Sequence, residues 1–257
     1  MSKIQKSFCI GHVPPLFDPG IEFVMLTPTA LGMSNQCVIP DNRFGAEVDG
    51  GSLAEYSQLF WLYDNIVSGE ILADELFLFQ YRKFISPKFG GLESVAPWIR
   101  VVPSNSLGDI FPTSEDLRIN STKLAVGSLF DFGESIAKNY ALVHEIDDLI
   151  LFSVACVESG AMNKTDLRMF ISIRGIIPSP AVCLTDVKLF LKVIEILYRV
   201  WNVYKSHSPA VRQGYQRRSA GYLLERLHSW LICKWLLDGS EPDVQLWNRY
   251  VVSSDIL

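Results

Sequence analysis

Apolar residues fill positions 76–79 without a break, and three polar residues, Gln80, Tyr81 and Arg82, follow directly. A surface strand of an antiparallel sheet alternates apolar and polar positions, whereas a short unbroken run is typical of a strand buried on both faces. Ligands bind at the carboxyl ends of strands in open parallel sheets. The pattern therefore predicts a strand over 75–80 that ends at a binding site. The alternative is a strand that ends at the surface with its cations in solvent.

Helical spacing of apolar residues marks the last third of the chain. The stretches 187–205 and 221–237 are rich in apolar and aromatic residues. No apolar run reaches the roughly 18 residues that a membrane span requires. We interpret both stretches as core helices, and the alternative is peripheral attachment to a membrane surface.

The whole pattern predicts one α/β domain over residues 1–257, with a helical C-terminal part at about 186–237. We expect strands near 7–12, 22–29, 75–80, 98–105 and 180–184, and helices near 53–66, 134–144, 147–158, 186–205 and 213–237. Residues 32–52 form a loop too long for a simple connector, and such loops are usually functional. The tail beyond 237 carries no clear pattern.

Charge and cysteine content narrow the functional classes. The 257 residues carry a net charge of −5, which does not fit the basic footprint of a nucleic-acid-binding protein. Five scattered cysteines form no CxxC pair, and the first residues, MSKIQKSF, are polar. We therefore expect a reduced, cytoplasmic setting without a signal peptide.

Glu55 has two interpretations. Ser52 and Glu55 have the spacing of a capping box, in which each side chain satisfies a free backbone N–H at the start of a helix. On a helical wheel, however, Glu55 falls on the apolar stripe with Leu59 and Leu62. An unpaired buried carboxylate is costly. Either the capping box explains Glu55, or this carboxylate helps form the floor of a site, in contact with Arg82 or a substrate hydroxyl.

The last predicted helix has two different faces. Arg218, Tyr222 and Glu225 follow i, i+4, i+7 spacing and share one face, opposite a face that carries Leu223, Leu224, Leu227, Trp230 and Leu231. A polar face of this kind is either solvated helix surface or the lining of a cleft. We predict that it closes a cleft against residues 80–82, with Glu225 holding Arg218 or a substrate group.

Two acidic clusters could carry metal or proton chemistry. Glu47 and Asp49 form a short carboxylate pair beside a glycine-rich turn and could bind Mg²⁺ or Mn²⁺ through oxygen, although acid-x-acid patterns are common. His144, Asp147 and Asp148 could also act, but they fit an ordinary junction between two helices equally well. The motifs of dinucleotide-binding dehydrogenases, P-loop enzymes, α/β-hydrolases and zinc hydrolases are absent.

Three blocks of sequence resemble a known family. They read EYSQLFWLYDN (55–65), FLFQYRKF (77–84) and YQRRSAGYLLERLHSWL (215–231). They are similar to the bacterial capsular polysaccharide and O-antigen glycosyltransferase family long catalogued as a domain of unknown function. Members carry an ELTxLYWxWKN helix, an HYRRYF strand end and an RxxGxxxExL helix. The matching residues are Glu55, Trp61, Tyr81, Arg82, Arg218, Gly221 and Glu225.

The chain also departs from the family pattern at three places. The histidine of the HYRRYF block is Gln80 here, a GDNIS segment is replaced by EVDGG (47–51), and an FNMF segment is replaced by SPAVCL (179–184). These departures leave undetermined which sugar donor the protein would use. They also keep open an alternative, a carbohydrate-binding or scaffolding module that has lost activity.

The resemblance implies a single GT-A-like (Rossmann-like) domain with a central, mostly parallel sheet. It implies a hexosyltransferase that moves a sugar from a nucleotide-sugar donor to a glycan or lipid-linked glycan acceptor of surface polysaccharide. Such an enzyme would act in the cytoplasm at the inner face of the membrane. Arg82 could stabilise the departing diphosphate, and Asp49, Glu55 or Glu225 could deprotonate the acceptor hydroxyl. Gln80, Tyr81, Arg218 and Tyr222 would bind substrate, with Mg²⁺ or Mn²⁺ as the candidate cofactor.

Overall fold

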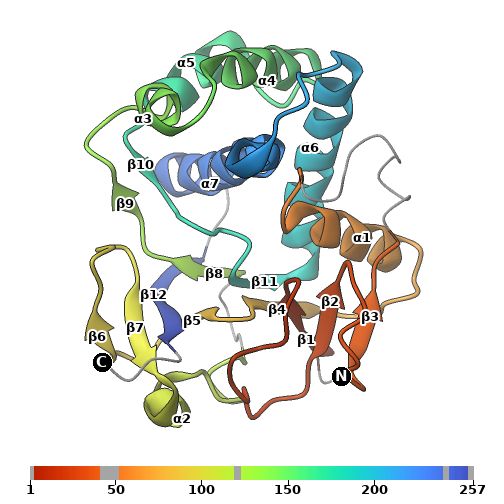
Figure 1. Cartoon of the computed structure of the whole chain (residues 1–257), viewed down its shortest axis with the longest axis vertical. Helices are drawn as coiled ribbons and strands as arrows, with labels where there is room; N and C mark the ends of the chain where they lie inside the picture. Colours follow the sequence, from red (N-terminus) through yellow and green to blue (C-terminus); the bar gives the residue numbers. More distant parts are fainter. Residues whose placement is uncertain (1–2, 41–51, 119–122, 240–242, 254–257) are drawn as a thin grey trace.

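The computed structural model describes residues 3–40, 52–118, 123–239 and 243–253 (Figure 1). The strands are β1 (Gln5–Ile10), β2 (Val24–Thr27), β3 (Gln36–Val38), β4 (Glu75–Gln80), β5 (Lys83–Ser86), β6 (Leu92–Glu93), β7 (Arg100–Pro103), β8 (Leu124–Gly127), β9 (Phe130–Asp131), β10 (Gly175–Ile176), β11 (Cys183–Asp186) and β12 (Val244–Ser253). Within the described ranges, ten of these strands form one sheet in the order β3-β2-β1-β4-β11-β8-β12-β7-β6, with β5 paired to β12. Strands β9 and β10 pair separately.

The central sheet is mostly parallel. Strands β3, β2, β1 and β4 run in one direction. Strand β11 runs antiparallel to both of its neighbours, β4 and β8, and β12 then pairs in parallel with β8 and β7. The sequence-based expectation of a mixed α/β fold around a mostly parallel sheet is therefore confirmed.

Helices cover the two faces of the sheet unequally. The helices are α1 (Tyr56–Val67), α2 (Leu107–Ile110), α3 (Ile136–Val143), α4 (Ile146–Glu158), α5 (Lys164–Ser172), α6 (Val187–Ser206) and α7 (Ser219–Asp238). In Figure 1, α1 and α3 to α7 gather on one side, and the short α2 lies on the other. Each side has its own core, which we call the helical core and the aromatic core.

Strand β4 separates these two cores. Leu76 and Leu78 point into the helical core, and Phe77 and Phe79 point into the aromatic core, where Phe79 packs against Phe111 with ring centres 5.9 Å apart. All four β4 side chains are at most 1% exposed. The absence of alternation in the sequence therefore reflects a strand buried on both faces, as expected.

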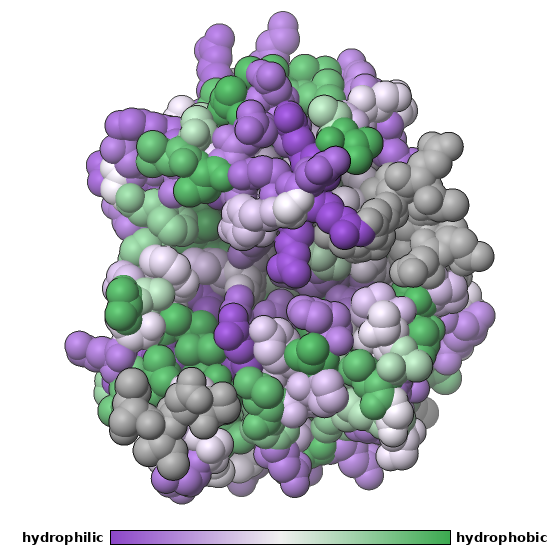
Figure 2. Space-filling model, viewed as in Figure 1, coloured by the Kyte–Doolittle hydropathy of each residue, from purple (hydrophilic) through white to green (hydrophobic). Residues whose placement is uncertain are grey.

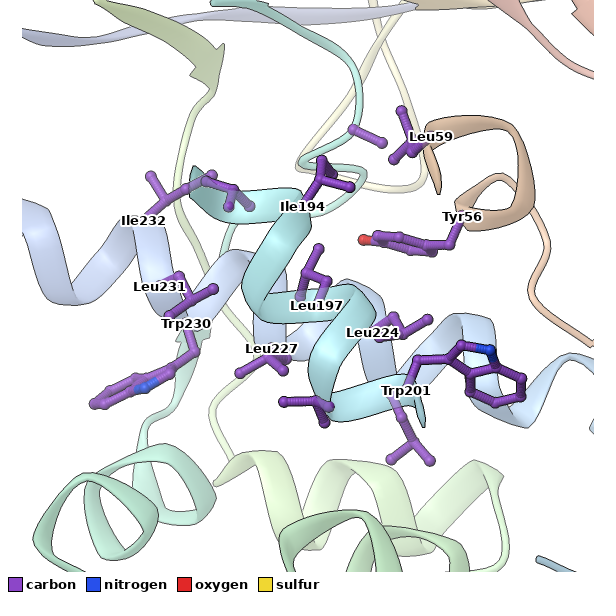
Figure 3. Packing of buried hydrophobic residues seen from close by; sticks show 14 of the residues in the cluster. Tyr56, Leu59, Ile194, Leu197, Trp201, Leu224, Leu227, Trp230, Leu231 and Ile232 are labelled. Carbon is purple, nitrogen blue, oxygen red and sulfur yellow. The ribbon is translucent and has the colours of Figure 1, made fainter. Parts of the chain in front are cut away.

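Helices α6 and α7 form the centre of the helical core, which confirms their interpretation as core helices. Figure 3 shows Leu197 and Trp201 of α6 packed beside Leu224 and Leu227 of α7, and Tyr56 of α1 beside them. Each of these five side chains is at most 3% exposed. Within the described ranges, no helix combines the length and the apolar character needed to span a bilayer.

The structure differs from the expected elements at several places. The tail beyond 237, which carries no clear pattern, supplies β12, a strand inside the sheet. The final helix begins at Ser219, because residues 214–218 form a separate 3-10 helix. Helix α5 and strands β5 and β8 were not predicted at all. Short strands are stabilised mainly by their cross-strand partners, so their own sequences identify them poorly.

Candidate active site

A cleft of about 490 Å³ opens at the carboxyl ends of the parallel strands. One side is the strand-end wall, which we define as residues 10–12, 28–29 and 80–83. The other is the helical wall, formed by Ala54, Glu55, Ser57, Gln58, Arg218, Gly221, Tyr222 and Glu225. Figure 2 shows a hollow across the middle of this face, bordered by hydrophilic residues. A second cavity, inside the helical core, measures about 10 Å³ and is too small for a substrate.

The strand order explains why the cleft lies here. Strand β1 is flanked by β2 on one side and by β4 on the other, so the chain reverses its direction of travel across the sheet beside β1. A crevice forms outside the strand ends at such a switch point, and ligands bind there in open α/β sheets. Gln58 ties helix α1 to this edge, because its Nε2 donates to the carbonyl oxygens of Gly11 (3.0 Å) and Leu26 (3.1 Å).

The strand-end wall carries aromatic and cationic side chains. The Arg82 guanidinium lies 5.4 Å from the centre of the Tyr81 ring, and the His12 ring meets Tyr81 edge-on at 5.8 Å. The Arg82 carbonyl accepts a 2.7 Å hydrogen bond from the backbone N–H of Val252, which fixes the backbone after β4. Gln80, Tyr81 and Arg82 all line the cleft, although the Arg82 side chain is exposed. The structure thus places these residues where the sequence pattern predicted.

Glu55 does not form the predicted capping box. Helix α1 begins at Tyr56, and Glu55 precedes it in helical backbone geometry with no side-chain cap hydrogen bond. Its half-buried carboxylate lines the cleft instead. Burial and the nearby charge of Glu225 raise the pKa of Glu55, while Lys83 and Arg218 act in the opposite direction. The alternative interpretation, a carboxylate in the floor of a site, agrees with this geometry, with Lys83 and Arg218 as the cations near it.

The polar face of α7 lines the cleft rather than open solvent. Tyr222 and Glu225 are half-buried in the helical wall, and Leu223, Leu224 and Leu227 on the opposite face are fully buried. Arg218 also lines the cleft, but it ends the 3-10 helix that precedes α7. The structure therefore places Tyr222 and Glu225 on a cleft-lining face of α7, whereas Arg218 lies before this helix and not on the predicted helical face.

Glu225 contacts a residue that the sequence analysis missed. We expected Glu225 to hold Arg218 or a substrate group. Its Oε1 instead accepts a 2.7 Å hydrogen bond from the backbone N–H of Ser179. The Ser179 hydroxyl in turn accepts from Lys83 Nζ at 3.4 Å, so Ser179 links the two walls. Its φ of 50° lies in the left-handed region that non-glycine residues rarely adopt. Such conformations persist where surrounding contacts enforce them, often at binding sites.

Gly221 permits the close approach that builds the helical wall. Its N–H donates to the Ser52 carbonyl at 2.9 Å. A Cβ at this position would lie 2.9 Å from the Ala54 Cβ and 3.1 Å from the Leu53 carbonyl oxygen. No larger residue fits here without displacing the backbone before α1. The contact brings the start of α7 against the start of α1, and so places Glu225 and Glu55 in the same cleft.

Two groups of candidate residues remain. Glu47 and Asp49 lie outside the described residues, and no group of three potential metal ligands occurs within those ranges. His144, Asp147 and Asp148 form the junction between α3 and α4, where the Asp148 carboxylate accepts from Arg212 at 2.9 Å. All five cysteines are free.

Comparison with known proteins identifies the fold. A scan against protein-family models finds no match, and a search of the curated proteins finds no significant match. A search of solved structures finds the apo structure of WbbM, described as a bifunctional glycosyltransferase, with a TM-score of 0.77 and 16% sequence identity. The match covers 98% of this chain and 46% of that chain, so this chain spans about half the length of the WbbM chain. The likeness shows a shared fold.

Proposed function

We propose that this protein is a glycosyltransferase of GT-A-like type. It moves a sugar from a nucleotide-sugar donor to a capsule-type or O-antigen-type polysaccharide acceptor. One observation carries the proposal: the switch-point cleft joins cationic strand ends to a half-buried carboxylate of raised pKa, Glu55. The shared fold with the bifunctional glycosyltransferase WbbM and the resemblance of three sequence blocks to a glycosyltransferase family support the same conclusion.

The strand-end wall would bind the donor. Glycosyl transfer leaves a nucleoside diphosphate whose negative charge grows as the bond to the sugar breaks. Fixed cations near that charge lower the barrier. Arg82 and Lys83 line this wall and would supply them, while the rings of His12 and Tyr81 offer faces for a base or sugar. Glu47 and Asp49, which lie outside the described residues, are the candidate ligands for a Mg²⁺ or Mn²⁺ ion, and such an ion would supply positive charge for the leaving diphosphate.

The helical wall would activate the acceptor. An acceptor hydroxyl becomes a good nucleophile when a carboxylate removes its proton during attack. We assign this role to Glu55, because burial makes its carboxylate a stronger proton acceptor than one in water. Glu225 would position Ser179 and Lys83 through the hydrogen bonds described above. Asp49 remains a further candidate for the base.

The acceptor also sets the place of action. A glycan or lipid-linked glycan under assembly would be reached from the cytoplasm at the inner face of the membrane, through peripheral association of this chain. No part of this proposal involves nucleic acid.

A donor panel tests the proposal directly. The protein is incubated with individual nucleotide sugars, with and without saccharide acceptors, and nucleotide release is measured. We expect release with one donor and its loss in Glu55→Gln, while both proteins retain the same thermal stabilisation by that donor. Absence of release with every donor, together with retained saccharide binding, would favour the alternative function, a non-catalytic carbohydrate-binding module.

A further inference from the structure

Three aromatic rings form a cluster that leads out of the cleft. The His144 ring lies 4.5 Å from the Tyr222 ring and 5.8 Å from the Tyr215 ring, with interplanar angles of 27° and 8°. The Tyr215 and Tyr222 ring centres are 5.3 Å apart. Tyr222 lines the cleft, whereas Tyr215 is 66% exposed. We call these three residues the aromatic shelf; it runs from the helical wall to the surface.

Hydrogen bonds fix the segment that carries the exposed ring. Gln216 Oε1 lies 3.0 Å from His144 Nδ1, and Gln216 Nε2 donates to the Val143 carbonyl at 2.7 Å. Since Gln216 uses its oxygen toward His144, the imidazole carries its proton on Nδ1. Burial lowers the pKa of His144, so the ring is neutral at pH 7 and adds no charge to the shelf.

An ion pair anchors the chain just before the segment that carries Tyr215. Arg212 donates to the Asp148 carboxylate through two nitrogens, with Nη2 2.9 Å from Oδ1 and Nε 3.2 Å from Oδ2. Asp148 is only 3% exposed, and paired contacts of this geometry are the strong ones. The exposed Tyr215 ring is therefore presented in a fixed orientation, although little of its surface is buried in the fold.

A fixed, exposed ring suits one kind of ligand especially well. The flat face of a pyranose presents C–H groups that are apolar and slightly positive, while the face of an aromatic ring is negative. The two surfaces pack together, and the hydroxyl groups at the sugar's edge keep their contact with water. A ring held in place loses little entropy when it binds.

We propose that the aromatic shelf is the acceptor subsite, where pyranose rings of the acceptor glycan stack on Tyr215. This inference rests on the proposed function, because it assumes that the cleft transfers sugar. Tyr222 and Glu225 lie three positions apart on α7, and residues at this spacing are neighbours on a helix surface. A glycan that stacks on the shelf is therefore directed toward the carboxylates of the helical wall. The charged diphosphate of the donor suits the cationic strand-end wall instead.

Saturation-transfer NMR tests this subsite separately from catalysis. The probes are methyl α- and β-pyranosides of glucose, galactose, mannose and rhamnose, with disaccharides of glucose and of galactose. Each is added to the wild type, Tyr215→Ala, Tyr215→Phe and a control, Phe89→Ala, which removes another exposed ring, 77% exposed. Thermal stabilisation by nucleotide sugars is measured on the same four proteins.

We expect at least one saccharide to bind the wild type, Tyr215→Phe and Phe89→Ala alike. We expect its affinity for Tyr215→Ala to fall about tenfold, since loss of one aromatic stacking contact is worth roughly this factor. Thermal stabilisation by the donor should be unchanged in all four proteins.

Equal saccharide binding by Tyr215→Ala, or no saccharide binding by the wild type, would overturn the inference. A loss of donor stabilisation in Tyr215→Ala alone would also overturn it, because the shelf would then bind the nucleotide. Tyr215-dependent saccharide binding without nucleotide release from any donor would leave the subsite standing and refute the proposed transfer.

Discussion

The two walls of the cleft are built by different means and carry different charges. Backbone pairing within the sheet holds the strand-end wall, which presents the cations Arg82 and Lys83 at its surface. Tertiary contacts between distant segments hold the helical wall, which presents the half-buried carboxylates Glu55 and Glu225. A cationic wall suits a departing diphosphate, whereas a partly desolvated carboxylate suits proton removal. In the proposed reaction, the strand-end wall therefore stabilises the leaving group and the helical wall activates the acceptor. Substitutions can alter each wall separately.

Removing the carboxylate of Glu55 should have the largest effect. We expect Glu55→Gln to reduce turnover roughly 10²- to 10⁴-fold, the usual contribution of a general base. Folding should not suffer at pH 7, because burial penalises the charged form that the substitution removes. A raised folded pKa means that the wild type loses stability as pH rises through that value. The stability difference between the two proteins should therefore shrink at acid pH.

Kinetics and thermal denaturation across pH measure both parts of this prediction. Glu70→Gln is the control, since Glu70 is exposed beyond the end of α1. Turnover by folded Glu55→Gln at the wild-type level would remove Glu55 from the role of base and leave Asp49 and Glu225 as the remaining candidates.

Removing a cation from the strand-end wall should come next. Arg82→Ala should lower turnover about 10²-fold, a typical cost of losing one electrostatic contact to the transition state. The melting temperature should change little, because the Arg82 side chain is exposed and its backbone hydrogen bond to Val252 remains. Arg174→Ala, at an exposed arginine outside the cleft lining, serves as the control. Equal turnover by the two variants would show that the strand-end wall does not act on the leaving group.

Gly221→Ala should damage the helical wall through packing alone. The added Cβ would lie 2.9 Å from the Ala54 Cβ and 3.1 Å from the Leu53 carbonyl oxygen. Overpacking of this kind destabilises by about 1–3 kcal/mol. Gly108→Ala is the matched control, because a Cβ there meets nothing within 4 Å. Urea denaturation of both variants measures the difference, and equal stabilities would mean that the start of α7 approaches the segment before α1 less tightly than described.

The smallest expected effect is a displaced pH profile. If Glu55 is the base, activity should fall at acid pH with a midpoint above the ordinary glutamate value of 4.5. The charge of Glu225 raises the pKa of Glu55, so Glu225→Gln should move this midpoint to lower pH. The glutamine can still accept the Ser179 N–H bond through its amide oxygen. Glu225→Ala cannot, and it should lose activity as well. An unmoved midpoint in Glu225→Gln would show that the two carboxylates do not interact.

The periodicity of apolar and polar residues along the sequence was sufficient to predict several parts of this protein. The buried strand β4, the core helices α6 and α7 and the inward-facing Glu55 followed from periodicity. The polar face with Tyr222 and Glu225 did too. Periodicity reports which residues share a face, and burial of the apolar face then decides its orientation. Residues 80–82 of the strand-end wall were predictable in the same sense, because they lie at the end of β4.

The tertiary structure decided which distant segments meet. It replaced the predicted capping box by a cleft-lining Glu55 and placed β12 inside the sheet. It also joined Glu225 to the backbone of Ser179, 46 residues away, and pressed Gly221 against Ala54. None of these contacts leaves a periodic signal, because each joins segments that lie far apart in the chain. Backbone geometry and long-range packing determine these contacts, and both can be seen only in the folded structure.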